Sequence, residues 1–139
     1  KAKQRARRFA MQAIYQGHLT QGDTTVITEK FLAQEEMVSV DTAYFLSLVQ
    51  GVLEDKVSLD TQLQLFLDRP LKELDLVELA ILRLGAYELS QHPEVPYKVI
   101  LNESIELAKM FGATDSYKYI NGILHLLAKK IRVLEFKDK

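Results

Sequence analysis

The sequence predicts an all-α fold, and three observations support this prediction. Its 139 residues include only three prolines and six glycines, so few positions interrupt a helix. Apolar residues recur mostly three or four positions apart, which is the period of a helix that buries one face. Apolar residues make up 47% of the chain and charged residues 27%, as in a globular protein with a sizeable core. We therefore expect one domain over residues 1–139, built of about seven helices.

Three helices are predicted in the first 55 residues. The first runs over about 3–18 and carries one apolar stripe, formed by Ala6, Phe9, Ala10, Ala13 and Ile14. The sequence GDTT then breaks the chain, and a second helix is expected over about 25–35. Asp41 is placed to cap a third helix, whose buried face would hold Phe45, Leu48, Val49, Val52 and Leu53.

The next helices are marked by proline and by a long apolar stretch. Ser58 is placed to cap a short fourth helix that must end near Pro70. The stretch LDLVELAILRLGAYELS is apolar around nearly its whole helical circumference. Such a helix belongs in the middle of a core, so we expect the fifth helix there.

Two further helices complete the prediction. Pro96 opens the sixth, and Gly112 stands where a left-handed cap would end it. Thr114 or Asp115 is expected to cap the last helix, which would pack Ile120, Ile123, Leu124, Leu127 and Ile131. A polar tail follows over about 133–139.

Positive charge is concentrated at the start of the chain. The formal net charge is only −1, yet residues 1–8 contain five basic residues and no acidic one, whereas residues 9–128 contain eight basic and 17 acidic residues. A helix N-terminus prefers anions by about 0.3–1 kcal/mol per charge, so a segment selected for stability alone would not carry cations there. The uneven distribution suggests a local site for a polyanion. A solvated helix end is the alternative, and composition does not decide between the two.

Helical spacing divides this basic segment. Arg5, Arg8, Gln12 and Tyr15 share the face opposite the apolar stripe. Arg7 lies about 60° from the centre of that stripe, so it is either a structural arginine at the core edge or a ligand contact. A tyrosine beside arginines suits stacking with single-stranded nucleic acid, and it equally suits a protein interface.

A second polar patch lies in the sequence ATDSYKYINGI. Lys118 points outward from the last predicted helix, Tyr119 lies on its flank, and helix capping is the favoured role of Asp115. Gly122 costs about 1 kcal/mol relative to alanine within a helix. Such a glycine is usually tolerated because two helices pack closely or because a partner approaches closely.

No arrangement typical of an enzyme is found. The chain has no cysteine, and His18, His92 and His125 fall on three different predicted elements. It contains neither a glycine-rich phosphate loop nor a Gly-x-Ser-x-Gly motif, and Glu103 with Glu106 is the kind of carboxylate pair that ordinary helix surfaces carry. We therefore expect no catalysis, no metal and no cofactor. No apolar run approaches the roughly 18 residues of a membrane span, so we expect a soluble cytoplasmic protein.

Three stretches resemble the NusB family of bacterial transcription antitermination factors. They are RARRFAMQAIYQ, LDLVELAILRLGAYELS and VPYKVILNESIELAKMFGATDSYKYINGIL, and the resemblance extends to about Arg132. It implies a helical fold of two packed sub-bundles and a protein that is not an enzyme. It also implies binding to the boxA element of nascent ribosomal RNA as a heterodimer with NusE, in an assembly with NusA, NusG and RNA polymerase.

The resemblance also implies roles for individual residues. The arginine-rich motif of the family falls on Lys3, Arg5, Arg7 and Arg8, with Gln4 where another arginine is common. An aromatic residue that faces RNA, usually phenylalanine, corresponds to Tyr119, and the aspartate before it corresponds to Asp115. We expect Lys118 to assist Tyr119 in holding an unstacked base and its backbone. The positions that face NusE correspond to Tyr15 and Glu78.

Two alternatives stay open beside this interpretation. The first is a helical protein-interaction module whose basic end is incidental. The second is the N-terminal domain of a ribosomal RNA cytosine methyltransferase, although the Rossmann-type catalytic domain that accompanies it is absent from these 139 residues and the polar end fits a natural C-terminus. A homodimer is also possible, since some family members self-associate.

Overall fold

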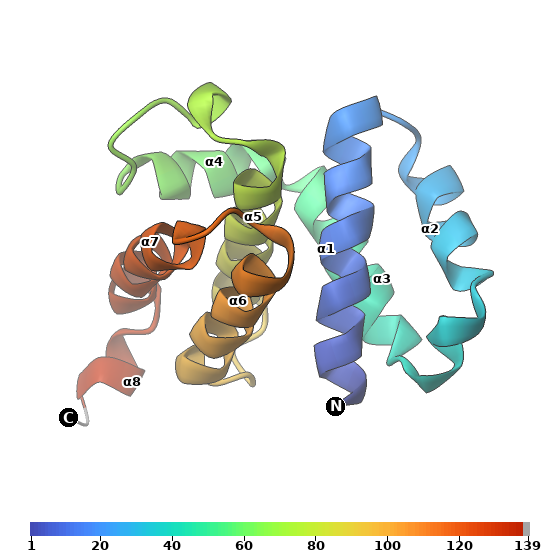
Figure 1. Ribbon diagram of the computed structural model, residues 1–139. Helices are drawn as coiled ribbons and strands as arrows, with labels where there is room; N and C mark the ends of the chain where they lie inside the picture. Colours follow the sequence, from blue (N-terminus) through green and yellow to red (C-terminus); the bar gives the residue numbers. More distant parts are fainter. Residues whose placement is uncertain (138–139) are drawn as a thin grey trace. The chain divides into compact units, whose positions relative to one another are not determined.

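The computed structural model describes residues 1–137 (Figure 1). This part of the chain forms eight α-helices and two short 3₁₀ segments, which confirms the all-α prediction. None of its helices is both long enough and apolar enough to span a membrane. The chain divides into two compact units, Lys1–Asp55 and Lys56–Lys139.

The first unit contains three α-helices and one 3₁₀ segment. They are α1 (Ala2–Thr20), α2 (Thr24–Leu32), η1 (Glu35–Ser39) and α3 (Thr42–Glu54). The helix α1 packs against both α2 and α3, which also contact each other (Figure 1). The predicted stripe of α1 is buried, and the rings of Phe31 and Phe45 lie 6.1 Å apart between α2 and α3.

Aspartates begin the second and third helices of this unit. The Asp41 carboxylate accepts a hydrogen bond of 3.0 Å from the Tyr44 backbone N–H, which confirms the predicted cap of α3. Asp23 does the same for α2 through the Thr25 N–H at 2.8 Å. The prediction that the second helix reaches residue 35 was wrong. The chain leaves α2 after Leu32 and turns through η1, which lets Met37 become buried.

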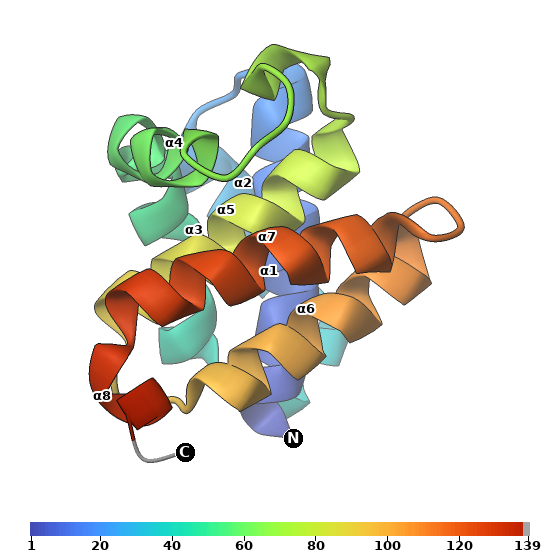
Figure 2. The same ribbon diagram turned by 90° about the vertical axis from the view of Figure 1, so that its left-hand side faces the viewer.

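The second unit is arranged around one apolar helix. Its elements are α4 (Lys56–Gln64), η2 (Leu71–Glu73), α5 (Leu76–Gln91), α6 (Tyr97–Phe111), α7 (Ser116–Ile131) and α8 (Val133–Lys137). The central helix α5 contacts α4, α6 and α7, as its apolar circumference predicted. Figure 2 shows α7 crossing in front of α5 with α6 beside it. A Cβ added to Gly85 would lie 2.6 Å from Leu124 Cδ1, so α5 and α7 can approach this closely only because Gly85 has no side chain.

Two predicted helix ends of this unit were wrong. Ser58 does not cap α4, because the helix already begins at Lys56. Gly112 does end α6 but not in a left-handed conformation, since its φ is −93° and its ψ is 175°. Space explains this glycine, because an added Cβ would lie 2.5 Å from Ser116 Oγ and 2.8 Å from the carbonyl oxygen of Ala108.

The predicted polar tail contains structure as far as it is described. Residues 133–137 form α8, and 138–139 lie outside the described residues. The Glu135 carboxylate accepts a hydrogen bond of 3.0 Å from the Tyr97 backbone N–H, and the ring of Phe136 stacks on that of Tyr97 at 4.3 Å. The helix α8 therefore covers the first turn of α6.

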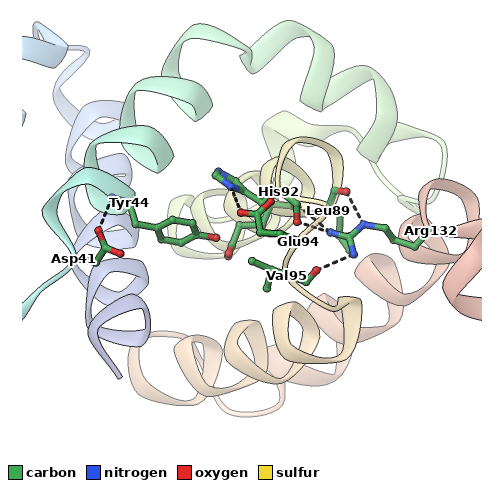
Figure 3. A network of polar contacts seen from close by, with 8 residues as sticks. Asp41, Tyr44, Leu89, His92, Glu94, Val95 and Arg132 are labelled. Carbon is green, nitrogen blue, oxygen red and sulfur yellow. Dashed lines mark hydrogen bonds and ion pairs between the residues drawn. The ribbon is translucent and has the colours of Figure 1, made fainter.

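A buried arginine closes the C-terminal end of α5 (Figure 3). Arg132 follows α7 directly and is only 7% exposed. Its guanidinium donates to four backbone carbonyl oxygens at distances from 2.8 to 3.3 Å, those of Glu88, Leu89, His92 and Val95. It also pairs with Glu135. A cation thus donates to carbonyls at the negative end of the helix dipole, two of which, those of Glu88 and His92, also accept a backbone hydrogen bond.

Candidate nucleic-acid interface

The first candidate surface lies at the start of α1 and comprises Lys3, Arg5 and Arg8; Arg5 and Arg8 share one face of the helix, while Lys3 lies on the side of Tyr44. Lys3 and Arg5 are exposed, and Arg8 is half-buried beside the half-buried Gln12 and Tyr15. The outward face inferred from the helical spacing is thus exposed at Arg5 and half-buried at its other three positions. Because no acidic residue lies in the first turn of α1, the charge of this face is not neutralised within that turn.

Arg7 differs from the other basic residues of α1. It is 4% exposed, and its guanidinium lies 5.5 Å from the centre of the Tyr44 ring on α3. The Lys3 ammonium lies 5.2 Å from the same ring. Burial against an aromatic ring favours the structural role for Arg7, with its charge directed at the negative face of the ring. Lys3 shares this ring while its side chain stays exposed.

The second candidate surface lies at the start of α7. Asp115 precedes the helix with a φ of 72°, and its side chain makes no capping hydrogen bond, so the predicted capping role was wrong. The conformation explains this, because an N-cap residue normally has an extended backbone. The carboxylate instead lies 3.5 Å from the Lys118 ammonium, and both side chains are about two-thirds exposed.

Tyr119 belongs to a cluster of three side chains. Its hydroxyl donates a hydrogen bond of 3.0 Å to Asp68 Oδ1, and the Arg69 guanidinium lies 4.8 Å from the centre of its ring. Asp68 and Arg69 also form an ion pair at 2.9 Å. We call these three residues the Tyr119 cluster. Asp68 and Arg69 were not predicted as site residues.

The electrostatics of the Tyr119 cluster follow from these contacts. The hydrogen bond from Arg69 and that from the Tyr119 hydroxyl together lower the pKa of Asp68. The carboxylate in turn raises the pKa of Arg69. Burial and the hydrogen bond to Asp68 raise the pKa of Tyr119, so its hydroxyl keeps its proton and stays a donor.

The loop that carries Asp68 and Arg69 is held in place from α4. The Gln64 side-chain amide donates to the Arg69 carbonyl oxygen at 3.1 Å and accepts from the Leu71 N–H at 3.4 Å. Pro70 restricts the backbone of Arg69, because a residue before proline avoids the helical region. The backbone under Arg69 is therefore ordered while its side chain is 43% exposed.

A second aromatic residue at the start of α7 is also surrounded by cations. The Lys109 ammonium on α6 lies 4.8 Å from the centre of the Tyr117 ring, and that of Lys118 lies 6.0 Å from it. Tyr117 and Tyr119 are both half-buried, and Lys118 lies between them, exposed. We call Tyr117, Lys118 and Tyr119 the α7 surface.

Gly122 lies one turn beyond the α7 surface. No other part of the described chain lies within 4 Å of a Cβ built on this residue, beyond its own helix and its chain neighbours. Close helix packing, one of the two reasons expected for it, is thereby excluded for residues 1–137. Of the two reasons expected for a glycine at this position, only the close approach of a partner then applies.

The two positions expected to meet a protein partner fall in different units. Tyr15 lies on α1 and Glu78 lies in the first turn of α5. Burial, and then the nearby Asp75, raise the pKa of Glu78. The predicted RNA residues divide in the same way, with Asp115, Lys118 and Tyr119 together in the second unit. Among residues 1–137, no three histidine, cysteine, aspartate or glutamate side chains are grouped so that they could hold a metal ion.

Comparisons with known proteins agree with this helical architecture. A model of the NusB family matches residues 4–129. The transcription antitermination protein NusB of Alcanivorax borkumensis is 49% identical over 99% of this chain and 92% of its own length. That of Idiomarina loihiensis is 51% identical over 88% of each chain.

Solved structures show the same fold. The structure of T. maritima NusB superimposes with a TM-score of 0.87 at 26% identity, covering 99% of this chain and 98% of that one. NusB from a crystal structure of the antitermination factors NusB and NusE with double-stranded RNA gives a TM-score of 0.78. It covers 91% of this chain and 96% of that one, and at 21% identity it supports the fold alone.

The family match and the relatives bear directly on the predicted function. They extend over nearly the whole chain, and the relatives are transcription antitermination proteins. The expectation of a non-enzymatic antitermination factor is thus confirmed. The chain belongs to the NusB family.

Proposed function

We propose that the chain binds boxA RNA of nascent ribosomal RNA transcripts as a heterodimer with NusE, within a complex that contains NusA, NusG and RNA polymerase. The observation that carries the RNA part is the α7 surface, where Tyr117 and Tyr119 lie beside exposed or partly exposed cations. The similarity to transcription antitermination proteins over nearly the whole chain supports the same direction. We expect single-stranded RNA here, because a base must be unstacked before a tyrosine can stack on it.

The two surfaces have different tasks in this proposal. Lys3, Arg5 and Arg8 on α1 contact backbone phosphates, which position the RNA without reading its sequence. Tyr119 stacks on an unstacked base, and Lys118 contacts the adjacent phosphate. Arg7 supports α1 from its buried position against Tyr44. Asp115 orients Lys118 through their ion pair.

Salt dependence tests the phosphate contacts. Three cations on α1 and Lys118 give about four phosphate contacts, so the logarithm of the association constant falls with that of the salt concentration at a slope near −3. Fluorescence anisotropy with a labelled boxA RNA measures this slope. Arg5→Ala combined with Arg8→Ala reduces its magnitude by about 1.4, since each phosphate contact contributes about 0.7. A flat salt response, or equal binding of boxA and scrambled RNA, would favour a protein-interaction module instead.

The heterodimer is tested at Tyr15 and Glu78. Tyr15→Ala and Glu78→Gln weaken binding to NusE and leave RNA binding by the isolated chain unchanged, as measured by calorimetry and anisotropy respectively. Adding NusE increases the affinity of the wild type for boxA RNA. Lack of this increase would contradict the adaptor role, while normal RNA binding in the same samples would leave the RNA part intact.

A further inference from the structure

The Asp68 carboxylate stands where a bound anion would stand. It accepts one hydrogen bond from the Tyr119 hydroxyl at 3.0 Å and one from Arg69 Nε at 2.9 Å. Arginine and tyrosine are donors that proteins commonly direct at phosphate oxygens. The cluster therefore already has the donors of a phosphate site, and a side chain of the protein itself occupies it.

We propose that Asp68 is an internal stand-in for an RNA phosphate and that Arg69 is a further RNA-binding residue. The inference rests on the proposed RNA binding at Tyr119. When RNA binds, a backbone phosphate takes the place of the carboxylate, and the Arg69 guanidinium and the Tyr119 hydroxyl donate to phosphate oxygens. Arg69 then supplies a phosphate contact beside the stacked base.

The contacts of Asp68 make such an exchange feasible. The side chains of Asp68 and Arg69 are 68% and 43% exposed, and an ion pair between exposed neighbours contributes little to stability. The second contact of the guanidinium with the carboxylate is long, at 3.5 Å. A phosphate offers arginine two oxygens in a favourable paired geometry, so it can replace a poorly aligned carboxylate.

Only side chains need to move. Gln64 holds the backbone on either side of Pro70, so Arg69 starts from an ordered position. Asp68 lies in the exposed loop and can turn its carboxylate into solvent. Its negative charge also opposes every other phosphate near Tyr119, which lowers the affinity of the resting protein for RNA.

Four proteins separate these roles: the wild type, Asp68→Asn, Arg69→Ala and the double variant. Asp68→Asn keeps the shape of the side chain and removes its charge, so we expect boxA RNA to bind about three- to tenfold more tightly in low salt. Arg69→Ala binds about three- to tenfold more weakly, with a salt slope smaller in magnitude by about 0.7. In the double variant the gain from Asp68→Asn falls below twofold, because the arginine that it releases is absent.

Matched controls report the general effect of charge. Glu106→Gln removes one negative charge from an exposed position of α6, and Lys130→Ala removes one positive charge from an exposed position near the end of α7. If either control changes affinity as much as the variant it matches, the local role of Asp68 or Arg69 is refuted. Equal gains from Asp68→Asn with and without Arg69 would refute the exchange.

The wild type separates this inference from the proposed function. If wild-type protein binds boxA RNA while Asp68→Asn and Arg69→Ala leave its affinity unchanged, the exchange fails and the proposed function stands. If the wild type does not bind boxA RNA in low salt, alone or with NusE, the proposed function fails first. All four substituted positions are exposed, so we expect each variant to keep the fold. Thermal unfolding of each variant checks this.

Discussion

Two arginines of the second unit show how one side chain can serve stability or recognition. Arg132 is buried, and its donors reach four backbone carbonyl oxygens and the carboxylate of Glu135. Arg69 is partly exposed, and it contacts one neighbouring carboxylate and one tyrosine ring. Both are ordered, yet only one has partners that a ligand can replace.

The difference lies in what the partners are. The carbonyls around Arg132 belong to the end of α5 and the chain after it, so they cannot move away without unfolding that end. Asp68 is an exposed side chain that rotates freely once its three hydrogen bonds are broken. An arginine whose acceptors are backbone carbonyls thus serves stability. An arginine whose acceptor is an exposed carboxylate can exchange that carboxylate for a ligand.

Breaking the buried network has the largest expected effect. Arg132→Ala removes the side-chain donor shared by four carbonyls, of which Glu88 and His92 keep a backbone donor, and it leaves Glu135 without its cation, so we expect a loss of about 3–5 kcal/mol in the free energy of unfolding. Urea denaturation followed by circular dichroism measures this loss. Lys130→Ala is the control, and it should change the free energy by no more than about 0.5 kcal/mol. A loss below about 1 kcal/mol for Arg132→Ala would contradict the network's role in stability.

A smaller effect is expected from the acid that completes this network. Burial raises the pKa of Glu135, but the hydrogen bond from the Tyr97 N–H and the pair with Arg132 outweigh it, and the net pKa is lowered. A lowered folded-state pKa stabilises the protein above the unfolded-state pKa, and this contribution is lost as the pH falls through the folded-state pKa. Glu135→Gln therefore costs about 1 kcal/mol at neutral pH, and wild type and variant converge in acid.

Denaturation of both proteins across a series of pH values tests this prediction. The difference between them isolates Glu135 from other groups that titrate in the same range, among them Glu78, whose raised pKa has the opposite effect on stability. A difference that stays constant from neutral pH into strong acid would contradict it.

Local patterns predicted the scaffold of the molecule. The apolar circumference of residues 74–90 placed α5 at the centre of its unit, and the stripe on α1 separated its buried face from its basic face. Asp41 was recognised as a cap because its chemistry acts within three residues. Each of these features depends on neighbours within one or two helical turns, which is where periodicity carries information.

The Tyr119 cluster could not be predicted in this way. Asp68 and Tyr119 are 51 positions apart, and no helical period links a loop residue to α7. The predictions at Gly112 and Asp115 were wrong for a related reason. Rules for helix ends are based on residue type and contain no information on the backbone angle φ. Gly112 is required because a side chain and a backbone carbonyl occupy the space that a Cβ would need. Asp115 has a left-handed backbone conformation, which does not suit capping. The sequence contained one signal that could have indicated this part of the site, namely an arginine directly before a proline, which restricts its backbone.

A substitution at Gly122 on α7 should change stability and RNA binding in opposite directions. A Cβ at this position meets open space, and alanine is the better helix former, so Gly122→Ala should raise the free energy of unfolding by about 0.5–1 kcal/mol. The same methyl group narrows the approach to Tyr119, so we expect weaker binding of boxA RNA. Thermal unfolding and anisotropy on one sample measure both. Gain of stability with unchanged RNA affinity would show that no partner comes close to this glycine.

The smallest expected change in stability is that of Arg69→Ala, and it completes the comparison of the two arginines. An exposed ion pair contributes little, and the loop is held by Gln64 through backbone groups that the substitution leaves in place, so the free energy of unfolding should stay close to that of the wild type. Urea denaturation beside Arg132→Ala measures the contrast. A loss as large as that of Arg132→Ala would mean that Arg69 is needed for the fold as Arg132 is, and an arginine needed in this way cannot exchange its carboxylate for a phosphate.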